Sequence, residues 1–469
     1  MHIRTFFIVC VGLSAASCTV GPDYRRPTIT GDTHEWVEPS SPGPVDISWW
    51  RNFNDPVLDR LIDRAITSSP DVAEATARIA EARANRDAAR GGREPMIVAK
   101  GSATENVLSK NGQLPIGSIP AFAREFRLFD IGFDASWELD LWGRHQREIE
   151  GANARVAVAQ FARRDVMLSL IAEVARNYVD LRSAEAETSA LKAIAAADAE
   201  LARLSELRFV AGEISRQEAD QAIANASTSR AAVPDSEAKA AAAAYRITAL
   251  VGAPPEELAP ELLRGGPLPS SPETILTGVR SDLLTRRPDV ARAERELAAA
   301  TADIGVAKAD LFPRFSLLGR IGQQARNPGD LPSSDSTRFQ MGPSFSWPVF
   351  ALGTIRARIR SSDARADEAA AQYEKAVLGA LSDSETAINR FLRASAALRA
   401  AEASLVQQRA AFALAEQRSN AGEDDRIALE DARKTLISSE RRRDQANASK
   451  SEAAINLYKA LGGGWRNGP

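Results

Sequence analysis

The chain carries an internal repeat, and this repeat constrains its fold more than any other feature of the sequence. Pro70-Asp71-Val72-Ala73 recurs 218 positions later as Pro288-Asp289-Val290-Ala291. Farther along, the offset becomes 210 and brings glycine and tryptophan into step as well. The pairs at that offset are Phe129-Asp130-Ile131-Gly132 with Phe339-Gln340-Met341-Gly342, Trp137 with Trp347, Gly143 with Gly353, and Ala211-Gly212-Glu213 with Ala421-Gly422-Glu423. The sequence therefore predicts two tandem structural repeats, residues 56–269 and 270–469.

Each repeat is predicted to contain a helix, two strands and then two long helices, which makes the fold class α+β. Proline at the first turn begins the helices near Pro70 and Pro288, because its missing N–H costs nothing there. The first repeat is expected to have strands at about 96–107 and 126–138, and long helices at about 144–209 and 215–250. In the second repeat we expect strands at about 314–323 and 338–347, and long helices at about 354–419 and 425–461.

The strands have one apolar and one polar face. Phe129, Ile131 and Phe133 alternate with Asp130 and Asp134, and the second repeat shows the same pattern. This period of two fits a soluble sandwich, and it equally fits a membrane barrel with lipid outside and water inside. Four strands are too few to close a barrel, and strand edges must be sealed in lipid. If the strands cross a membrane, several copies of the chain must share one barrel.

The long helices have the spacing of coiled coils. No proline lies between Arg144 and Phe209, and apolar residues such as Ile171, Val174 and Tyr178 recur every three or four positions. A helix of this length spans about 100 Å at 1.5 Å per residue. Such helical hairpins cannot enclose a globular core alone, so their apolar seams need partners.

The first residues have the layout of a secretory signal peptide. A basic start with Arg4 precedes an apolar run, and small residues lead up to Cys18. We expect residues 1–17 to be the signal peptide and Cys18 to carry lipid, followed by an extended segment over 18–55. The alternative is ordinary cleavage nearby with Cys18 unmodified. Thr19, which is not acidic, favours the outer membrane over retention at the inner membrane.

Composition excludes several functional classes. The 62 acidic and 59 basic residues give a net charge of −3, which argues against nucleic-acid binding. A mean hydropathy of −0.25 rules out a polytopic helical membrane protein. The two cysteines lie within the first 18 residues, and the three histidines are far apart. We therefore expect no metal site, no cofactor and no catalytic residues, and we expect His34 and His145 to be ordinary surface residues.

Five motifs occur in order along the chain from Cys18 to Trp465. They are Cys18–Tyr24, Trp49–Pro56, Trp137–Arg144, Asp282–Val290 and Leu461–Trp465. Together they resemble the TolC-like outer-membrane efflux factors, in the NodT-type lipoprotein branch found in tripartite (RND-type) efflux systems.

The resemblance implies a homotrimer in the outer membrane. Four transmembrane strands from each chain would form one twelve-stranded β-barrel, continuous with an α-helical barrel in the periplasm. The tunnel would dock a periplasmic adaptor (membrane fusion) protein, which links it to an inner-membrane pump. Such a channel would export drugs, solvents or other toxic small molecules by passive conduction, with the lipid of Cys18 and the barrel both in the outer-membrane lipid.

The resemblance also assigns candidate sites. The hairpin turns would be the periplasmic tips that contact the adaptor and form the gate, and Asp431 would line the aperture. Exposed ion pairs are weak enough for a partner to break, so we further expect Glu423–Asp425 to pair with Arg216 or Arg418 at the gate. The tip residues are Gly212, Glu213, Arg216, Gly422, Glu423, Asp424 and Asp425. The plainer interpretation is that the glycines end helices with positive φ and the acidic residues favour a helix start. Trp137 and Trp347 are expected at the membrane interface, with a place in the core as the alternative.

Three other functions remain open from the sequence. The channel could export metal ions, or it could serve type I protein secretion, because the pump selects most substrates. A trimeric coiled-coil lipoprotein scaffold without conduction is the third, and the apolar face of the strands argues against it. An enzyme is not expected, because the sequence has no nucleophile motif, metal spacing or phosphate loop.

Overall fold

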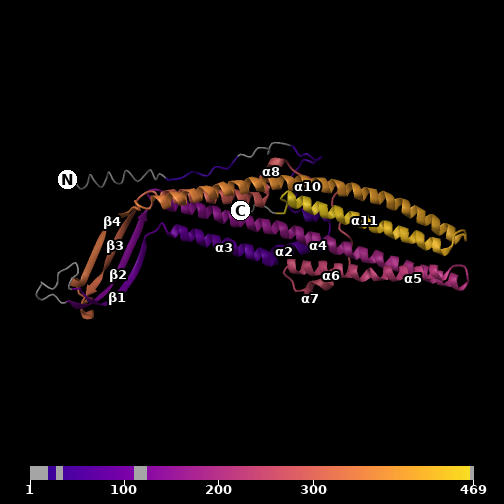
Figure 1. Ribbon diagram of the computed structural model, residues 1–469, viewed down its shortest axis with the longest axis horizontal. Helices are drawn as coiled ribbons and strands as arrows, with labels where there is room; N and C mark the ends of the chain where they lie inside the picture. Colours follow the sequence, from indigo (N-terminus) through magenta and orange to yellow (C-terminus); the bar gives the residue numbers. More distant parts are fainter. Residues whose placement is uncertain (1–18, 28–34, 110–123, 465–469) are drawn as a thin grey trace. The chain divides into compact units, whose positions relative to one another are not determined.

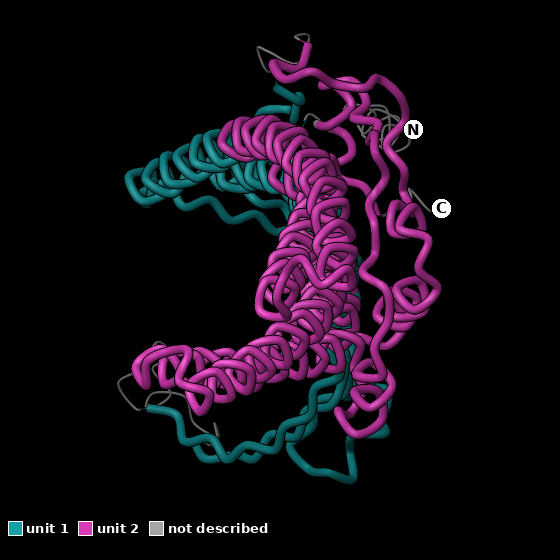
Figure 2. The backbone as a smooth tube through the Cα atoms, turned by 90° about the vertical axis from the view of Figure 1, so that its right-hand side faces the viewer, with its two compact units in different colours: residues 1–27, 80–158, 294–372 teal, residues 28–79, 159–293, 373–469 magenta. Residues whose placement is uncertain are grey.

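The computed structural model describes residues 19–27, 35–109 and 124–464. The predicted signal peptide, Cys18 and His34 lie outside these ranges. The chain forms two compact units (Figure 2): unit 1 comprises Met1–Pro27, Ala80–Val158 and Glu294–Gln372, and unit 2 comprises Thr28–Ile79, Ala159–Ala293 and Tyr373–Pro469. Each unit contains parts of both sequence repeats, so the repeat boundary is not a boundary between units.

Unit 1 contains a four-stranded antiparallel sheet in the order β1-β2-β3-β4 (Figure 1). The strands are β1 (Met96–Val107), β2 (Glu125–Leu139), β3 (Arg314–Ala325) and β4 (Thr337–Ser346). Each repeat supplies one strand pair, and the pairing of β2 with β3 joins the two repeats. In this sheet β1 and β4 are the edge strands, each with one strand neighbour.

The two faces of the sheet differ as the alternation predicts. One face carries exposed apolar side chains, among them Ile131 (58% exposed), Phe133 (56%) and Phe339 (68%). A soluble sandwich would bury this face under a second layer. The other face carries the polar and charged residues, including Asp130 and Asp134, which pair across the register with Gln324 and Arg320.

Long helices precede and follow the strands. They are α3 (Pro70–Gly91), α4 (Arg144–Val210), α9 (Pro288–Ala309), α10 (Leu352–Asn420) and α11 (Arg426–Ala460). The helix expected over 215–250 is instead two helices, α5 (Arg216–Ala231) and α6 (Val233–Leu250). Pro234 lies just after the break, and a proline has no N–H to continue the helical hydrogen bonds.

Short elements complete unit 2. These are α2 (Pro56–Ser68), α7 (Pro255–Leu262), α8 (Arg280–Arg286) and the 3-10 turn η2 (Trp49–Phe53). Within the ranges that the structure covers, no helix is both long enough and apolar enough to cross a lipid bilayer.

The Trp49–Pro56 motif packs the start of unit 2 against its C-terminal helix. Trp49 is fully buried and stacks on Tyr458, with ring centroids 5.1 Å apart. One oxygen of Asp55 caps α2 by accepting from the N–H of Val57 at 2.8 Å, and the other accepts from the hydroxyl of Tyr178 at 2.9 Å. Burial raises the pKa of Tyr178 to about 12, so this hydroxyl stays a donor.

Candidate functional site

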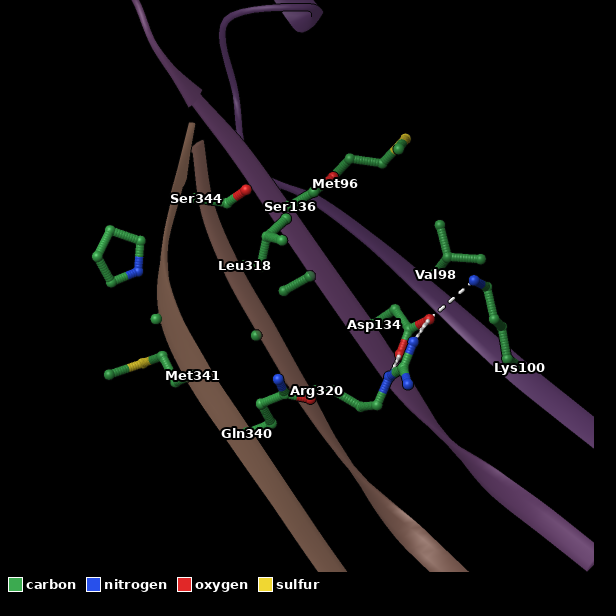
Figure 3. Close-up of a pocket in the computed structure, with 14 residues that line it drawn as sticks. Met96, Val98, Lys100, Asp134, Ser136, Leu318, Arg320, Gln340, Met341 and Ser344 are labelled. Carbon is green, nitrogen blue, oxygen red and sulfur yellow. Dashed lines mark hydrogen bonds and ion pairs between the residues drawn. The ribbon is translucent and has the colours of Figure 1, made fainter. Parts of the chain in front are cut away.

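The polar face of the sheet holds a cluster of charges centred on Asp134. Lys100 Nζ on β1 lies 2.8 Å from one carboxylate oxygen of Asp134, and Arg320 Nε on β3 lies 2.8 Å from the other. Figure 3 shows the two cations reaching Asp134 on β2 from the strands on either side. The register explains this convergence, because Asp134 pairs directly with Arg320. One carboxylate therefore serves two cations.

A second ion pair lies on the same face. Arg338 Nη2 donates to Asp130 Oδ1 at 2.6 Å, and Gln324 donates to the other oxygen of Asp130 at 2.8 Å.

A recess of about 610 Å³ lies on this face and is lined by Lys100, Asp134, Arg320 and by apolar residues that include Met96 and Leu318. Polar groups and apolar walls thus meet in one hollow.

Two glycines bring β2 and β3 unusually close within this face. Gly132 pairs with Gly322. A Cβ added at Gly132 would lie 2.4 Å from the carbonyl oxygen of Ile321, and one added at Gly322 would lie 2.5 Å from that of Ile131. Neither position can hold a side chain without moving backbone, so the polar face has bare backbone here.

The two predicted interface tryptophans make the same hydrogen bond in each repeat. The indole N–H of Trp137 donates to the carbonyl of Arg93 at 3.0 Å, and that of Trp347 donates to the carbonyl of Leu311 at 3.1 Å. Both side chains are part-exposed, at 39% and 48%. Each indole therefore has an apolar body at the surface and a satisfied polar end, which suits an interfacial position.

The turns at Gly212 and Gly422 are identical in their backbone bonding. Both glycines have positive φ, 77° and 76°. The N–H of Glu213 donates to the carbonyl of Arg208 at 2.9 Å, and the N–H of Glu423 donates to that of Arg418 at 3.0 Å. This is the 6→1 bond of a helix end that uses glycine in the left-handed region. The helix-end interpretation is therefore correct, whatever further role the turns have.

The charges of the second turn pair largely within it. Arg418 lies 2.8 Å from Asp424 and 3.7 Å from Glu423. Arg208, the repeat equivalent of Arg418, lies 3.9 Å from Asp425 and so links the two turns.

Arg216 has other partners. It pairs with Glu206 at 3.5 Å and with Asp220 at 2.7 Å, within its own hairpin. The sequence singled out Arg216 and missed Arg208. Arg208 could have been found from the internal repeat, because it lies 210 residues before Arg418.

The remaining acidic residues near this turn have unlike surroundings. Asp431 is exposed, whereas Glu430 is buried, at 4% exposure, and lies 3.5 Å from Arg433. Asp198 on α4 is also buried and contacts Lys434 on α11 and the hydroxyl of Ser229 on α5. This contact ties the first hairpin to the return helix of the second.

His145 is not the surface residue that the sequence suggested. Its side chain is buried in unit 1, with Nδ1 at 3.0 Å from Glu148 and Nε2 at 3.8 Å from Glu138. Its backbone N–H donates to Asp140. Glu148 lies one turn along the same helix, whereas Glu138 is at the end of β2 and Asp140 is in the turn that follows, so the burial of His145 could not be predicted from helix spacing alone. Among the residues that the structure places, no group of three or more His, Cys, Asp or Glu side chains is arranged to hold a metal.

Comparison with known proteins decides the family. A family model described as "Outer membrane efflux protein" matches residues 61–253 and 279–463. The chain belongs to the outer membrane efflux protein family. This efflux protein is 31% identical to the pyoverdine export outer membrane protein OpmQ of Pseudomonas aeruginosa, over 89% of this chain and 88% of that protein.

Two further comparisons agree. Nodulation protein T of Rhizobium leguminosarum bv. trifolii is 28% identical over 83% of this chain and 82% of that protein. The solved outer-membrane channel OprN superposes with a TM-score of 0.84 at 34% identity, covering 96% of this chain and 100% of that one. The predicted TolC-like fold of two strand pairs and long helices is confirmed.

The efflux protein is therefore an outer-membrane channel component of an efflux system, with its strands in the membrane and its helices in the periplasm. Channels of this family work as trimers with an adaptor and an inner-membrane pump.

The sequence analysis identified the hairpin tips as candidate sites and missed the charged cluster around Asp134. The alternation of the strands places Asp134 on the polar face, but only the register brings Lys100 and Arg320 to it.

Proposed function

We propose that three copies of this chain close one twelve-stranded barrel and that substrates leave passively through its lumen. The observation that supports this most is the sheet itself: one face is apolar and exposed, and among the described residues each edge strand has a strand neighbour on one side only. In lipid, unpaired edge groups each cost several kcal/mol, so β1 of one copy must pair with β4 of the next. Three copies supply the twelve strands of a closed barrel.

The proposed cargo is small organic molecules, such as drugs, solvents or other toxic compounds, and the protein performs no chemistry on them. The similarity to a pyoverdine export protein supports a small-molecule cargo over protein secretion or metal ions. The pump would select most of what enters, so the channel needs a wide, water-filled path rather than a tight binding site. No cofactor is required for passive conduction.

We propose a lipid anchor on Cys18 after removal of residues 1–17. The segment expected to be extended over 18–55 is not extended throughout, because its last part forms the 3-10 turn η2 (Trp49–Phe53). The residues after Cys18 are held firmly in unit 1. The N–H of Val20 donates to the carbonyl of Trp142 at 3.0 Å, and the buried Arg147 binds Asp23 at 2.7 Å. Gly21 packs against Gly305 so closely that a Cβ would lie 2.5 Å from its Cα. These contacts hold the chain directly after the proposed anchor beside the end of β2.

The hairpin turns are the proposed adaptor contacts and the site of the gate. A resting tunnel must be closed, or the outer membrane would leak. The pairs of Arg418 with Asp424 and of Arg208 with Asp425 are exposed, so a docking partner can replace them at low cost. Gly212, Glu213 and Arg216 form the first contact surface, and Gly422 with Glu423 forms part of the second. Exposed Asp431 is proposed to line the aperture.

Purified full-length protein tests the proposal in two ways. Chemical cross-linking should give a particle near three times 50.4 kDa, less the leader peptides. In planar lipid bilayers the same preparation should produce discrete conductance steps in KCl. A stable monomer with full strand content would contradict the shared barrel. Trimers that never conduct would favour the scaffold alternative instead.

A further inference from the structure

We propose that the recess around Lys100, Asp134 and Arg320 is a transit site for amphiphilic organic anions, molecules with one anionic group and an apolar body. This inference rests on the proposed function, because the polar face looks into water only when three copies close the barrel. It goes beyond that function by assigning a substrate class to the strand part of the channel.

The charge balance of the recess is positive. Its lining holds Lys100 and Arg320 against Asp134, and the side chains of Lys100 (64% exposed) and Arg320 (46%) share that single carboxylate. Arg338 and Asp130 lie beside the recess and pair with each other. Two further charges on this face do not change the balance: Glu138 pairs with Arg144, and Arg314 pairs with Asp310. Each chain therefore offers one uncompensated cation, and a trimer would carry a ring of three.

The polar face of the sheet also carries apolar side chains in the recess. Met96 pairs with Ser136, and Ser136 with Leu318, so both apolar residues lie on the polar face. Val98 pairs with Asp134. Met96 is 61% exposed, Leu318 46% and Val98 38%. Sites for small molecules commonly combine apolar walls with a few fixed polar groups, and this recess has both.

Bare backbone lies beside the recess, although the two glycines concerned are not part of its lining. Lys100 pairs with Gly132, Gly132 with Gly322, and Gly322 with Arg338, so two glycines lie between two cations in one row across the sheet. No Cβ fits at either glycine. An anionic group held in the recess by Lys100 and Arg320 would meet no side chain over these glycines, and its apolar body would lie toward Met96 and Leu318.

The test is block of KCl current through single trimers in phosphatidylcholine bilayers, with the probe added on the strand side. 2-Naphthalenesulfonate carries a permanent anion on an apolar body and should reduce the current with a measurable apparent Kd. Benzyltrimethylammonium has an apolar body with the opposite charge, and methanesulfonate has the anion without the body. Both should block at least about fivefold more weakly, since each lacks one of the two contacts.

Variants with opposite expected signs make the test sharp. Lys100→Gln should raise the apparent Kd of 2-naphthalenesulfonate up to about fivefold, the range of one exposed charge contact. Asp134→Asn should lower the apparent Kd, because it removes the carboxylate that competes with the ligand. Arg127→Gln is the matched control. Arg127 lies on β2, as Asp134 does, but on the apolar face, where it pairs with Glu105 at 3.8 Å. It should leave the apparent Kd unchanged.

The outcomes separate the two proposals. Variants are compared only as trimers with wild-type KCl conductance, and Lys100→Gln and Asp134→Asn are independent tests if one fails to assemble. Channels that conduct but show equal block by all three probes, or no change in Lys100→Gln and Asp134→Asn, would overturn the anion site and leave the channel intact. A protein that never conducts would overturn the proposed function itself.

Discussion

At the hairpin tips, single arginines connect acidic side chains that would otherwise repel one another. Arg208 and Arg418 occupy equivalent positions in the two repeats, and each pairs with the glutamate just after its turn glycine, Glu213 and Glu423. Exposed ion pairs of this kind contribute about 0–1 kcal/mol each. Several together can hold a tip closed and still yield to a docking partner.

Replacing Arg418 with Ala should therefore raise basal conductance in bilayers without a pump, and should increase uptake of large antibiotics by cells. Arg409→Ala is the control, since Arg409 is on the same helix and pairs with Glu440 away from the turn.

Asp431→Asn should shift the reversal potential under a salt gradient toward weaker cation preference. Wild-type conductance and reversal potential in both Arg418→Ala and Asp431→Asn would show that the charged tips are not the gate.

A pair of half-buried carboxyls makes the helical part sensitive to pH. Asp180 on α4 and Glu452 on α11 share a hydrogen bond, and burial raises the pKa of both above the ordinary values of 3.8 and 4.5, against the opposing charge of Arg176. The folded protein thus holds these protons more tightly than the unfolded chain. The pair's stabilising contribution is full below the ordinary pKa values and falls as the pH rises through the raised ones.

Glu452→Gln should accordingly raise the Tm at about pH 7 relative to wild type, and the gain should vanish at about pH 4. Thermal unfolding of the trimer followed by circular dichroism at both pH values measures this. Glu402→Gln, at an exposed position on α10, is the control and should show no such gain. A gain of equal size at both pH values would show that proton binding is not its cause.

At the scale of elements, the Gly132–Gly322 contact decides how closely the two repeats can pair. Gly132→Ala would place a Cβ 2.4 Å from the carbonyl oxygen of Ile321, so β2 and β3 must separate. We expect a large loss of assembled trimer, measured by gel mobility of unheated membrane extracts. Gly319→Ala on the inner strand β3 is the matched control, because a Cβ there lies 3.6 Å from the Cβ of Ala135, an ordinary contact. Equal trimer yield from both variants would mean that the strands adapt to the added methyl group.

The strands and helices also show which structural features can be predicted from the sequence alone. Alternation over Phe129–Trp137 correctly separates the apolar face from the polar one, because side chains on a strand point to opposite sides in turn. The helix expected over 215–250 was wrong in its continuity, although Pro234 stood in the sequence. Local sequence patterns therefore predict whether a segment is a helix or a strand more reliably than they predict where a helix is interrupted.

At the scale of the molecule, anchoring should be separable from insertion. Cys18→Ser should abolish incorporation of labelled fatty acid and slow maturation, because signal removal is coupled to lipid attachment in the proposed route. Conductance of the extracted protein should persist, since the barrel holds itself in the membrane by its apolar face. Wild-type protein that takes up no label would remove the lipid anchor. Loss of all conductance in Cys18→Ser would show that the anchor is needed for assembly.

The sequence by itself determined the repeats, the element types, the two-faced strands and the glycine turns, because each follows from local spacing along the chain. The family resemblance also came from ordered local motifs. Only the tertiary structure decided which charges meet. Asp134 pairs with Lys100 and Arg320, His145 lies near Glu138 at the end of β2, and Arg208 rather than Arg216 reaches Asp425. These partners are far apart in sequence or on different elements, and strand register and helix packing bring them together.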